Sequence, residues 1–156
     1  LQILRLGGYI MREILFRGKS TETNQWIYGG FHIWEKRQVC ALGNDRLKDD
    51  EISCVITVNS FADWNMPRTM QAVEVIADTV GQYTGLTDRN GNKIFEGDIV
   101  NILTENEEIG VIVYEDGGFI VHADKFSIDI IYKINRTDVE VIGNKYDNPK
   151  LMEIQE

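Results

Sequence analysis

Short apolar runs separated by tight-turn residues dominate this 156-residue sequence, and they favour β-strands over helices. The runs are rich in Val, Ile, Tyr and Phe, whereas the whole chain holds only two prolines and 14 glycines. β-Branched and aromatic side chains suit a pleated, half-buried surface, and glycine permits the turns that join strands. Strands are therefore expected over residues 13–17, 25–34, 38–42, 52–58, 73–76, 82–86, 98–103, 110–114, 119–122, 128–134 and 139–142.

Two dipeptides predict hairpins between these strands. Asp116-Gly117 and Asn90-Gly91 each lie between two apolar runs, and both are turn sequences that tolerate positive backbone φ angles. Helical signals are weak. Residues 59–64 could form one helical turn, and Asn148-Pro149 resembles an N-cap with proline at the first position of a short C-terminal helix.

Alternation within residues 25–34 gives that strand two distinct faces. Trp26, Tyr28, Gly30, His32 and Trp34 share one face, and the apolar residues between them occupy the other. The strand is expected to be covered on both sides. Aromatic residues also continue beyond this strand, and the expected interaction surface consists of Trp26, Tyr28, Trp34 and Trp64, with Phe31 and Phe61 nearby in sequence.

The charge is distributed unevenly along the chain. Sixteen Lys and Arg residues against 25 Asp and Glu residues give a net charge of −9, of which residues 81–156 carry −8. We expect an N-terminal β subdomain over residues 11–80 and a C-terminal one over 81–156, or one continuous domain, with residues 1–10 as an extension. An acidic surface disfavours both phosphate binding by the C-terminal half and attachment to an anionic membrane.

Neither the cysteines nor the apolar runs indicate a special compartment. Cys40 and Cys54 have no metal-ligand or redox spacing, and two buried free thiols are expected, a disulfide between strands being the alternative. No run approaches the roughly 18 apolar residues of a membrane span, and residues 1–10 make a poor signal peptide. The expected location is the cytoplasm.

Motifs for catalysis or ligand binding fail on inspection. Gly18-Lys19-Ser20 resembles the end of a phosphate-binding loop, but the required earlier glycine is Glu13 and a strand follows. The segment 88–99 resembles a calcium loop, but Lys93 replaces its glycine. No catalytic residue, metal site or cofactor is therefore predicted. An enzyme using His122 with Asp124 as its base remains an alternative, and His32 is the other histidine.

The sequence resembles the YopX family of phage and prophage proteins. The resemblance is carried, in order, by Met11-Arg12-Glu13-Ile14-Leu15-Phe16-Arg17, Gln25-Trp26-Ile27-Tyr28-Gly29, Thr79-Val80-Gly81-Gln82-Tyr83-Thr84-Gly85-Leu86-Thr87-Asp88-Arg89-Asn90-Gly91, Lys93-Ile94-Phe95-Glu96-Gly97-Asp98-Ile99-Val100 and Val141-Ile142-Gly143-Asn144-Lys145-Tyr146-Asp147-Asn148-Pro149-Lys150-Leu151. It implies a phage-related protein inside a bacterial host cell. It brings no catalytic residues with it, because the family has no established activity.

The family motifs also have a physical interpretation. Glu96-Gly97-Asp98 is the kind of turn that begins a strand in small SH3-like barrels, since glycine permits the backbone reversal and aspartate accepts backbone N–H groups. Five strands with glycine turns suit a small closed barrel in the C-terminal half. The residues expected to maintain it are Gly85, Asp88, Gly91, Glu96, Gly97, Asp98, Gly143 and Asn144.

The expected function is that of a non-catalytic phage accessory protein acting through protein contacts, as a homo-oligomer or with another protein. One alternative is an acidic decoy that occupies a host nucleic-acid-binding protein through carboxylates placed like phosphates. Its candidate residues are Glu105, Glu107, Glu108, Glu115 and Asp116. The second alternative is an enzyme of nucleotides or nucleic acid.

Overall fold

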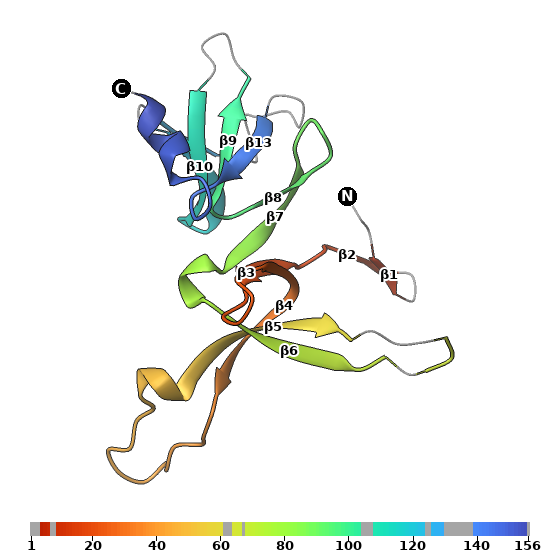
Figure 1. Cartoon of the computed structure of the whole chain (residues 1–156), viewed down its shortest axis with the longest axis vertical. Coiled ribbons are helices and arrows are strands. Elements are labelled where there is room, and N and C mark those ends of the chain that lie inside the picture. Colours follow the sequence, from red (N-terminus) through yellow and green to blue (C-terminus); the bar gives the residue numbers. More distant parts are fainter. Residues whose placement is uncertain are drawn as a thin grey trace. The chain divides into compact units, whose positions relative to one another are not determined.

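The mostly β prediction is confirmed by a computed structural model, which describes residues 4–6, 9–60, 64–66, 68–103, 108–123, 126–129 and 139–155 (Figure 1). The chain divides into two compact units. We call Leu15–Val80 the open unit, and we call Leu1–Ile14 together with Gly81–Glu156 the core unit.

The open unit is built on four antiparallel strands in the order β6-β5-β4-β3. Only three of its hydrophobic side chains in the described residues are buried, namely Val55, Ile56 and Val75. Its elements are β3 (Phe16–Lys19), β4 (Trp26–Glu35), η1 (Asp49–Glu51), β5 (Ile52–Asn59), β6 (Met70–Val75) and η2 (Ala77–Thr79).

Two predictions for the open unit are wrong. Residues 38–42 form an irregular loop instead of a strand, because the connection between β4 and β5 is held by polar contacts of Arg37 and not by strand pairing. The strand β4 is not covered on both sides either, since every residue from His32 to its end at Glu35 is exposed.

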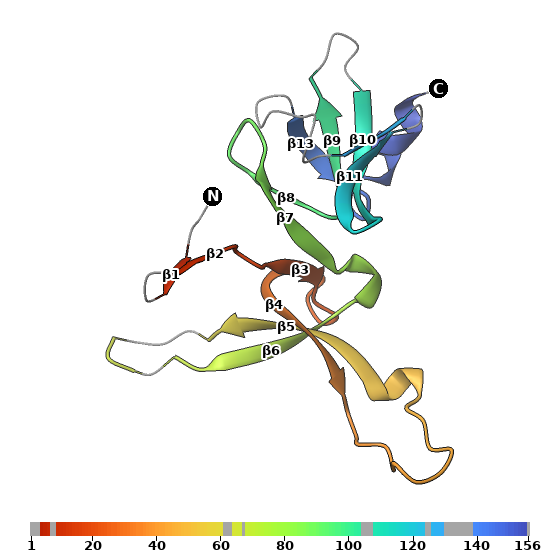
Figure 2. The same cartoon turned by 180° about the vertical axis from the view of Figure 1, so that it is seen from behind.

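The core unit contains a five-stranded antiparallel sheet in the order β12-β11-β10-β9-β13 (Figure 2). Its main hydrophobic cluster combines residues of several strands: Ile94, Val100, Ile102, Ile112, Phe119, Val121 and Val139. The sheet consists of β9 (Asp98–Ile102), β10 (Glu108–Glu115), β11 (Gly118–Ala123), β12 (Phe126–Asp129) and β13 (Val139–Asn144).

The same unit also has two antiparallel strand pairs and a terminal helix. These are β1 (Leu4–Leu6) with β2 (Tyr9–Met11), β7 (Gly81–Thr87) with β8 (Lys93–Phe95), and η3 (Pro149–Gln155). The helix has 3-10 geometry, starts after Asn148 and has proline first.

The closed SH3-like barrel is not found among the described residues. Closure requires the two edge strands of a sheet to pair, but β12 and β13 lie at opposite ends of the strand order. The strand β13 pairs with β9 instead, with a register shift between Val141 and Gly143. The described residues of the C-terminal half thus form a packed open sheet.

Both predicted hairpin turns are confirmed. Asp116 and Gly117 have φ angles of 49° and 83° between β10 and β11, the positive values that a type I′ turn requires. Gly91, with φ of 86°, lies in the turn between β7 and β8. The predicted helical turn at 59–64 and the predicted strand at 128–134 lie partly outside the described residues. Within the part of the chain described, no helix is long and apolar enough to cross a bilayer.

Candidate interaction surface

Three aromatic residues of β4, namely Trp26, Tyr28 and Trp34, lie on one side of the open unit's sheet, and Phe31 lies on the other. The register pairs Arg17 with Tyr28, His32 with Val55 and Trp34 with Ser53, and paired residues of antiparallel strands point to the same side. Trp26, Tyr28 and Trp34 therefore share a face by the alternation of the strand, as the sequence predicted.

Trp26 is engaged within the unit. The Arg17 guanidinium lies 4.6 Å from the centre of its ring and the Lys19 ammonium 5.5 Å from it. Arg17 is itself 6% exposed, so the indole covers a buried cation. A cation held against a ring in this way stabilises the sheet, and Trp26 is better explained as part of the fold than as part of a contact surface.

Tyr28 and Trp34 are half-exposed at the surface. Their exposed fractions are 49% and 51%, large values for rings on a strand face. Next to Trp34, the Ser53 hydroxyl donates a hydrogen bond to a carboxylate oxygen of Glu74, and Lys36 lies 3.9 Å from the same oxygen. The surface at this point combines an indole ring with a small polar network, a composition typical of protein contact sites.

Trp64 does not belong to this face. It lies in the connection between β5 and β6 and is 90% exposed, with Met66 and Met70 beside it in sequence at 64% and 79%. Of the four residues predicted for the surface, the fold thus gives two, Tyr28 and Trp34, an exposed position on one strand. Phe61 lies outside the described residues.

The loop between β4 and β5 is organised by Arg37, which sequence reasoning missed. Its guanidinium donates to both carboxylate oxygens of Asp45 at 2.8 and 3.0 Å, to Glu51 at 2.6 Å and to the carbonyl of Arg46. The hydrogen bonds from Arg37, with one from the Cys40 N–H, lower the pKa of Asp45 to about 2. The same guanidinium, with the Lys48 N–H, lowers the pKa of Glu51. Asp45 and Glu51 lie 8 and 14 residues from Arg37, and no pattern in the sequence indicates that these three side chains meet.

The family-motif residues lie in turns of the core unit and in the strands beside them. Asp88 is 3% exposed, and its carboxylate accepts hydrogen bonds from the N–H groups of Asn90, Asn92 and Val141 and from the Asn92 amide. Burial opposes its ionisation, but these four donors outweigh burial and lower the pKa of Asp88. The carboxylate joins the β7–β8 turn to β13.

The other motif residues have comparable surroundings. Asp98, 2% exposed, accepts a hydrogen bond from the Phe95 N–H at 2.7 Å, and the Glu96 N–H donates to the Gln82 carbonyl. Gly97 has φ of 82°, and a Cβ there would lie 3.1 Å from the ring of Tyr146. Gly85 also has positive φ, a Cβ on Gly143 would meet Asn148, and the Asn144 side chain caps the following turn.

The candidate residues of the two alternative functions, the acidic decoy and the enzyme, do not form one site among the described residues. Glu115 and Asp116 are exposed at the β10–β11 turn and Glu108 begins β10, whereas Glu105 and Glu107 lie outside the described residues. His122 on β11 and His32 on β4 are both exposed, and Asp124 is again outside the described residues. In the part of the chain described, no three His, Cys, Asp or Glu side chains are placed to hold a metal ion.

The two cysteines are free, but they are not both buried as predicted. Cys40 is exposed because it lies in the Arg37 loop and not on a strand, and Cys54 on β5 is half-buried. The burial of Cys40 was predicted from the apolar residues around it. These residues do not pair with another strand, so the side chain stays exposed.

The fold thus defines a β-rich protein with a turn-braced packed sheet and a second sheet that exposes aromatic side chains. Residues 15–153 match the family model described as YopX protein, and the chain belongs to this family. It is similar to the SPbeta prophage-derived uncharacterized protein YopX of Bacillus subtilis (strain 168), with 27% identity over 134 residues that cover 79% of this chain and 95% of that protein. A crystal structure of protein EF1440 from Enterococcus faecalis is similar with a TM-score of 0.49 and 23% identity, over 91% of this chain and 99% of that one.

Proposed function

We propose that this chain is a non-catalytic prophage accessory protein of the bacterial cytoplasm that acts through protein contacts, made by the Tyr28 and Trp34 face of β4. The observation that carries the proposal is the half-exposure of these two rings on one face of one strand. Such rings offer large apolar area at low conformational cost, and for this reason they are frequent at the centres of protein interfaces.

Exposed apolar side chains are concentrated in the open unit, which carries the Tyr28 and Trp34 face. Of the twelve exposed large hydrophobic residues among those described, nine belong to the open unit, and Tyr28 and Trp34 are two of them. Membership of the YopX family and the similarity to a prophage-derived protein support the phage-related part of the proposal.

The experiment measures assembly with and without this surface. The molar mass of the wild-type chain is determined by size-exclusion chromatography with light scattering over a hundredfold concentration range, and the chain is used as bait in lysate of its host. The double variant Tyr28→Ser/Trp34→Ser should lose the assembled species or the captured protein. Ile142→Ser, which changes an exposed hydrophobic residue of the core unit at 36% exposure, is the matched control and should retain both.

A strictly monomeric wild-type chain that captures no protein would contradict the proposal. So would a double variant that assembles like the wild type while its circular dichroism spectrum is unchanged. Equal losses in the double variant and in Ile142→Ser would point to unfolding, because the control residue lies on the other unit.

A further inference from the structure

The strand β6 leaves one edge of the open unit's sheet unpaired. It is the last strand in the order β6-β5-β4-β3, and all six of its residues pair with β5 on the other side. The outer side is used only near its C-terminal end, where the Thr21 N–H donates to the Glu74 carbonyl at 3.1 Å and the Ile76 N–H donates to the Lys19 carbonyl at 2.8 Å.

These two bonds fix which main-chain groups face outward. Backbone groups alternate between the two sides of an antiparallel strand, so Met70 and Ala72 point their N–H and C=O groups the same way as Glu74. Among the described residues, nothing bonds to these four groups on the outer side. The turn between β3 and β4 covers the edge at Glu74 and stops there.

The open part of the edge lacks the usual protection against strand pairing. Residues Met70–Val73 carry no charge and no proline, and their register with β5 runs without a bulge. Met70 is 79% exposed, and Gln71 and Ala72 are also exposed. Natural edge strands are normally shielded by lysines, prolines or bulges, because an open row of main-chain groups pairs readily with another extended chain.

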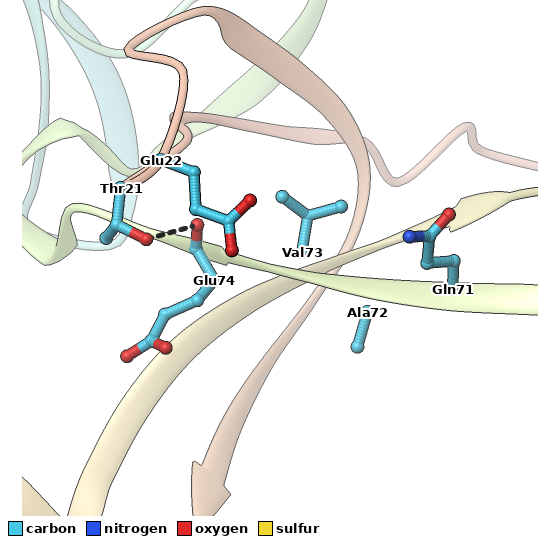
Figure 3. Close-up of a pocket in the computed structure, with 6 residues that line it drawn as sticks. All are labelled: Thr21, Glu22, Gln71, Ala72, Val73 and Glu74. Carbon is cyan, nitrogen blue, oxygen red and sulfur yellow. Dashed lines mark hydrogen bonds between the residues drawn. The ribbon is translucent and has the colours of Figure 1, made fainter.

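A shallow hollow follows this edge and carries an acidic side chain. Figure 3 shows the hollow with the Glu22 carboxylate projecting over the strand near Val73, on the side of β6 that also presents Gln71. Ala72 and the Glu74 side chain point to the opposite side of the strand. In the part of the chain described, the Glu22 carboxylate forms no ion pair, whereas Glu74 is bonded to Ser53 and lies near Lys36. The hollow is lined by Thr21, Glu22, Gln71, Ala72, Val73 and Glu74.

We propose that the Met70–Val73 edge of β6 binds an extended peptide segment of another protein by strand addition, with a Lys or Arg of that segment against Glu22. Main-chain hydrogen bonds to Met70 and Ala72 supply the affinity. The Val73 side chain favours an apolar peptide residue next to the basic one. The Thr21 bond to Glu74 ends the pairing at that residue. This edge is distinct from the Tyr28 and Trp34 face, so the inference does not depend on the proposed function.

A second copy of the chain fits the edge less well. Pairing β6 with its own equivalent would bring Met70–Val75 of each copy together, and this segment contains Glu74 but no basic residue. The paired segments would then bring no cation to either Glu22 carboxylate, because the exposed Arg68 lies two residues before Met70 and outside the pairing. A basic extended segment satisfies the main-chain groups and the carboxylate together.

The test is an NMR titration of the full-length chain labelled with 15N. The probe is a seven-residue capped peptide of Thr and Val with one central Lys, added to millimolar concentration, and the control peptide has Glu in place of Lys. The Lys peptide should shift the amide signals of Met70 and Ala72 and slow their hydrogen exchange. The Tyr28→Ser/Trp34→Ser variant should give the same titration, which separates this result from that of the proposed function.

Two variants of the chain make the test decisive. Glu22→Gln should weaken binding of the Lys peptide about two- to fivefold, the range of an exposed ion pair, and should strengthen binding of the Glu peptide because the like-charge repulsion is removed. Glu35→Gln, an exposed carboxylate on β4, is the matched control and should change nothing. Ala72→Pro removes an outward N–H and should abolish binding of the Lys peptide. The amide signals of β5 in this variant report whether the sheet has formed.

Three outcomes would overturn the proposal. The first is a peptide that shifts signals elsewhere but not at Met70 and Ala72. The second is equal binding of the Lys and Glu peptides, or no effect of Glu22→Gln. The third is concentration-dependent protection of Met70 and Ala72 without any peptide, which would assign the edge to a second copy of the chain.

Discussion

The two units of this protein use their hydrophobic residues in opposite ways. The core unit buries eleven hydrophobic side chains among the residues described and exposes three large ones, whereas the open unit buries three and exposes nine. Both are built on antiparallel sheets. The strands of the core unit share a packed cluster around Ile112 and Val121, whereas the described residues of the open unit form no comparable cluster.

The comparison indicates what stabilises each unit. Burial of apolar area dominates in the core unit, at about 25 cal/mol for each Å² removed from water. The open unit depends more on main-chain pairing and on polar contacts such as those of Arg37 and of Arg17 with Trp26. Apolar side chains that are not needed for folding are then available for contacts with other molecules.

The largest expected effect is a core deletion, because it tests the burial difference directly. Ile112→Ala, at a side chain with 0% exposure, should lower the free energy of unfolding by about 2–5 kcal/mol. Ile33→Ala makes the same chemical change at 54% exposure and should change it by less than about 0.5 kcal/mol. Urea unfolding followed by far-UV circular dichroism measures both, with hydrogen exchange to assign the loss to the core unit. Equal losses would refute the comparison.

A smaller effect is expected from Asp88→Asn, which tests the turn that braces the core unit. The amide keeps one acceptor oxygen but turns an NH₂ group toward the N–H of Val141 and the amide of Asn92, at a cost of about 1–3 kcal/mol. Urea unfolding at pH 7 measures this loss. A variant as stable as the wild type would show that the turn does not depend on the charge.

The same variant should alter the pH dependence of stability. The pKa of Asp88 is lowered from its ordinary value of 3.8, so its ionised form is favoured in the fold. Its stabilising contribution is complete above that value and is lost as the pH falls through the lower pKa of the folded state. Asp88→Asn should flatten the stability curve below about pH 4, as measured by urea unfolding at each pH.

The smallest expected effect is local and concerns the Arg37 loop. The folded pKa of Asp45 is about 2, below its ordinary 3.8, so the stabilising contribution of its carboxylate is complete above about pH 4 and declines as the pH falls through about 2. Arg37→Lys keeps the charge but removes the forked pair of bonds, and the pKa of Asp45 should rise toward 3.8. An NMR titration of the carboxyl carbon measures it. An unchanged pKa would show that Arg37 does not set it, and global stability should stay unaffected in either case.

Much of this architecture could be predicted from the sequence, for local reasons. Apolar runs and glycine turns located β4, β5, β7, β9, β10, β11 and β13, because alternation and turn chemistry act within a few residues. The short strands β1 and β2 were not predicted. The strand expected at 38–42 failed since its apolar residues had no pairing partner, and a local pattern carries no information about partners.

The candidate surface was also predictable only in part. Alternation correctly placed Tyr28 and Trp34 on one face, but nothing local distinguished them from Trp26, whose ring is occupied by Arg17 from the neighbouring strand. The edge of β6 had only a faint signal, the uncharged run Met70–Val73. Its importance depends on the strand order, and strand order is a long-range property.

The sequence by itself determined the β-rich class of this protein, its two hairpin turns and the acidity of its second half. Only the tertiary structure decided that the five-stranded sheet stays open, that Asp88 joins the β7–β8 turn to β13, and that two aromatic rings and one strand edge remain exposed. The physical reason is the distance along the sequence over which the interactions act. Turn and strand preferences arise from neighbouring residues, whereas exposure and pairing depend on segments tens of residues apart.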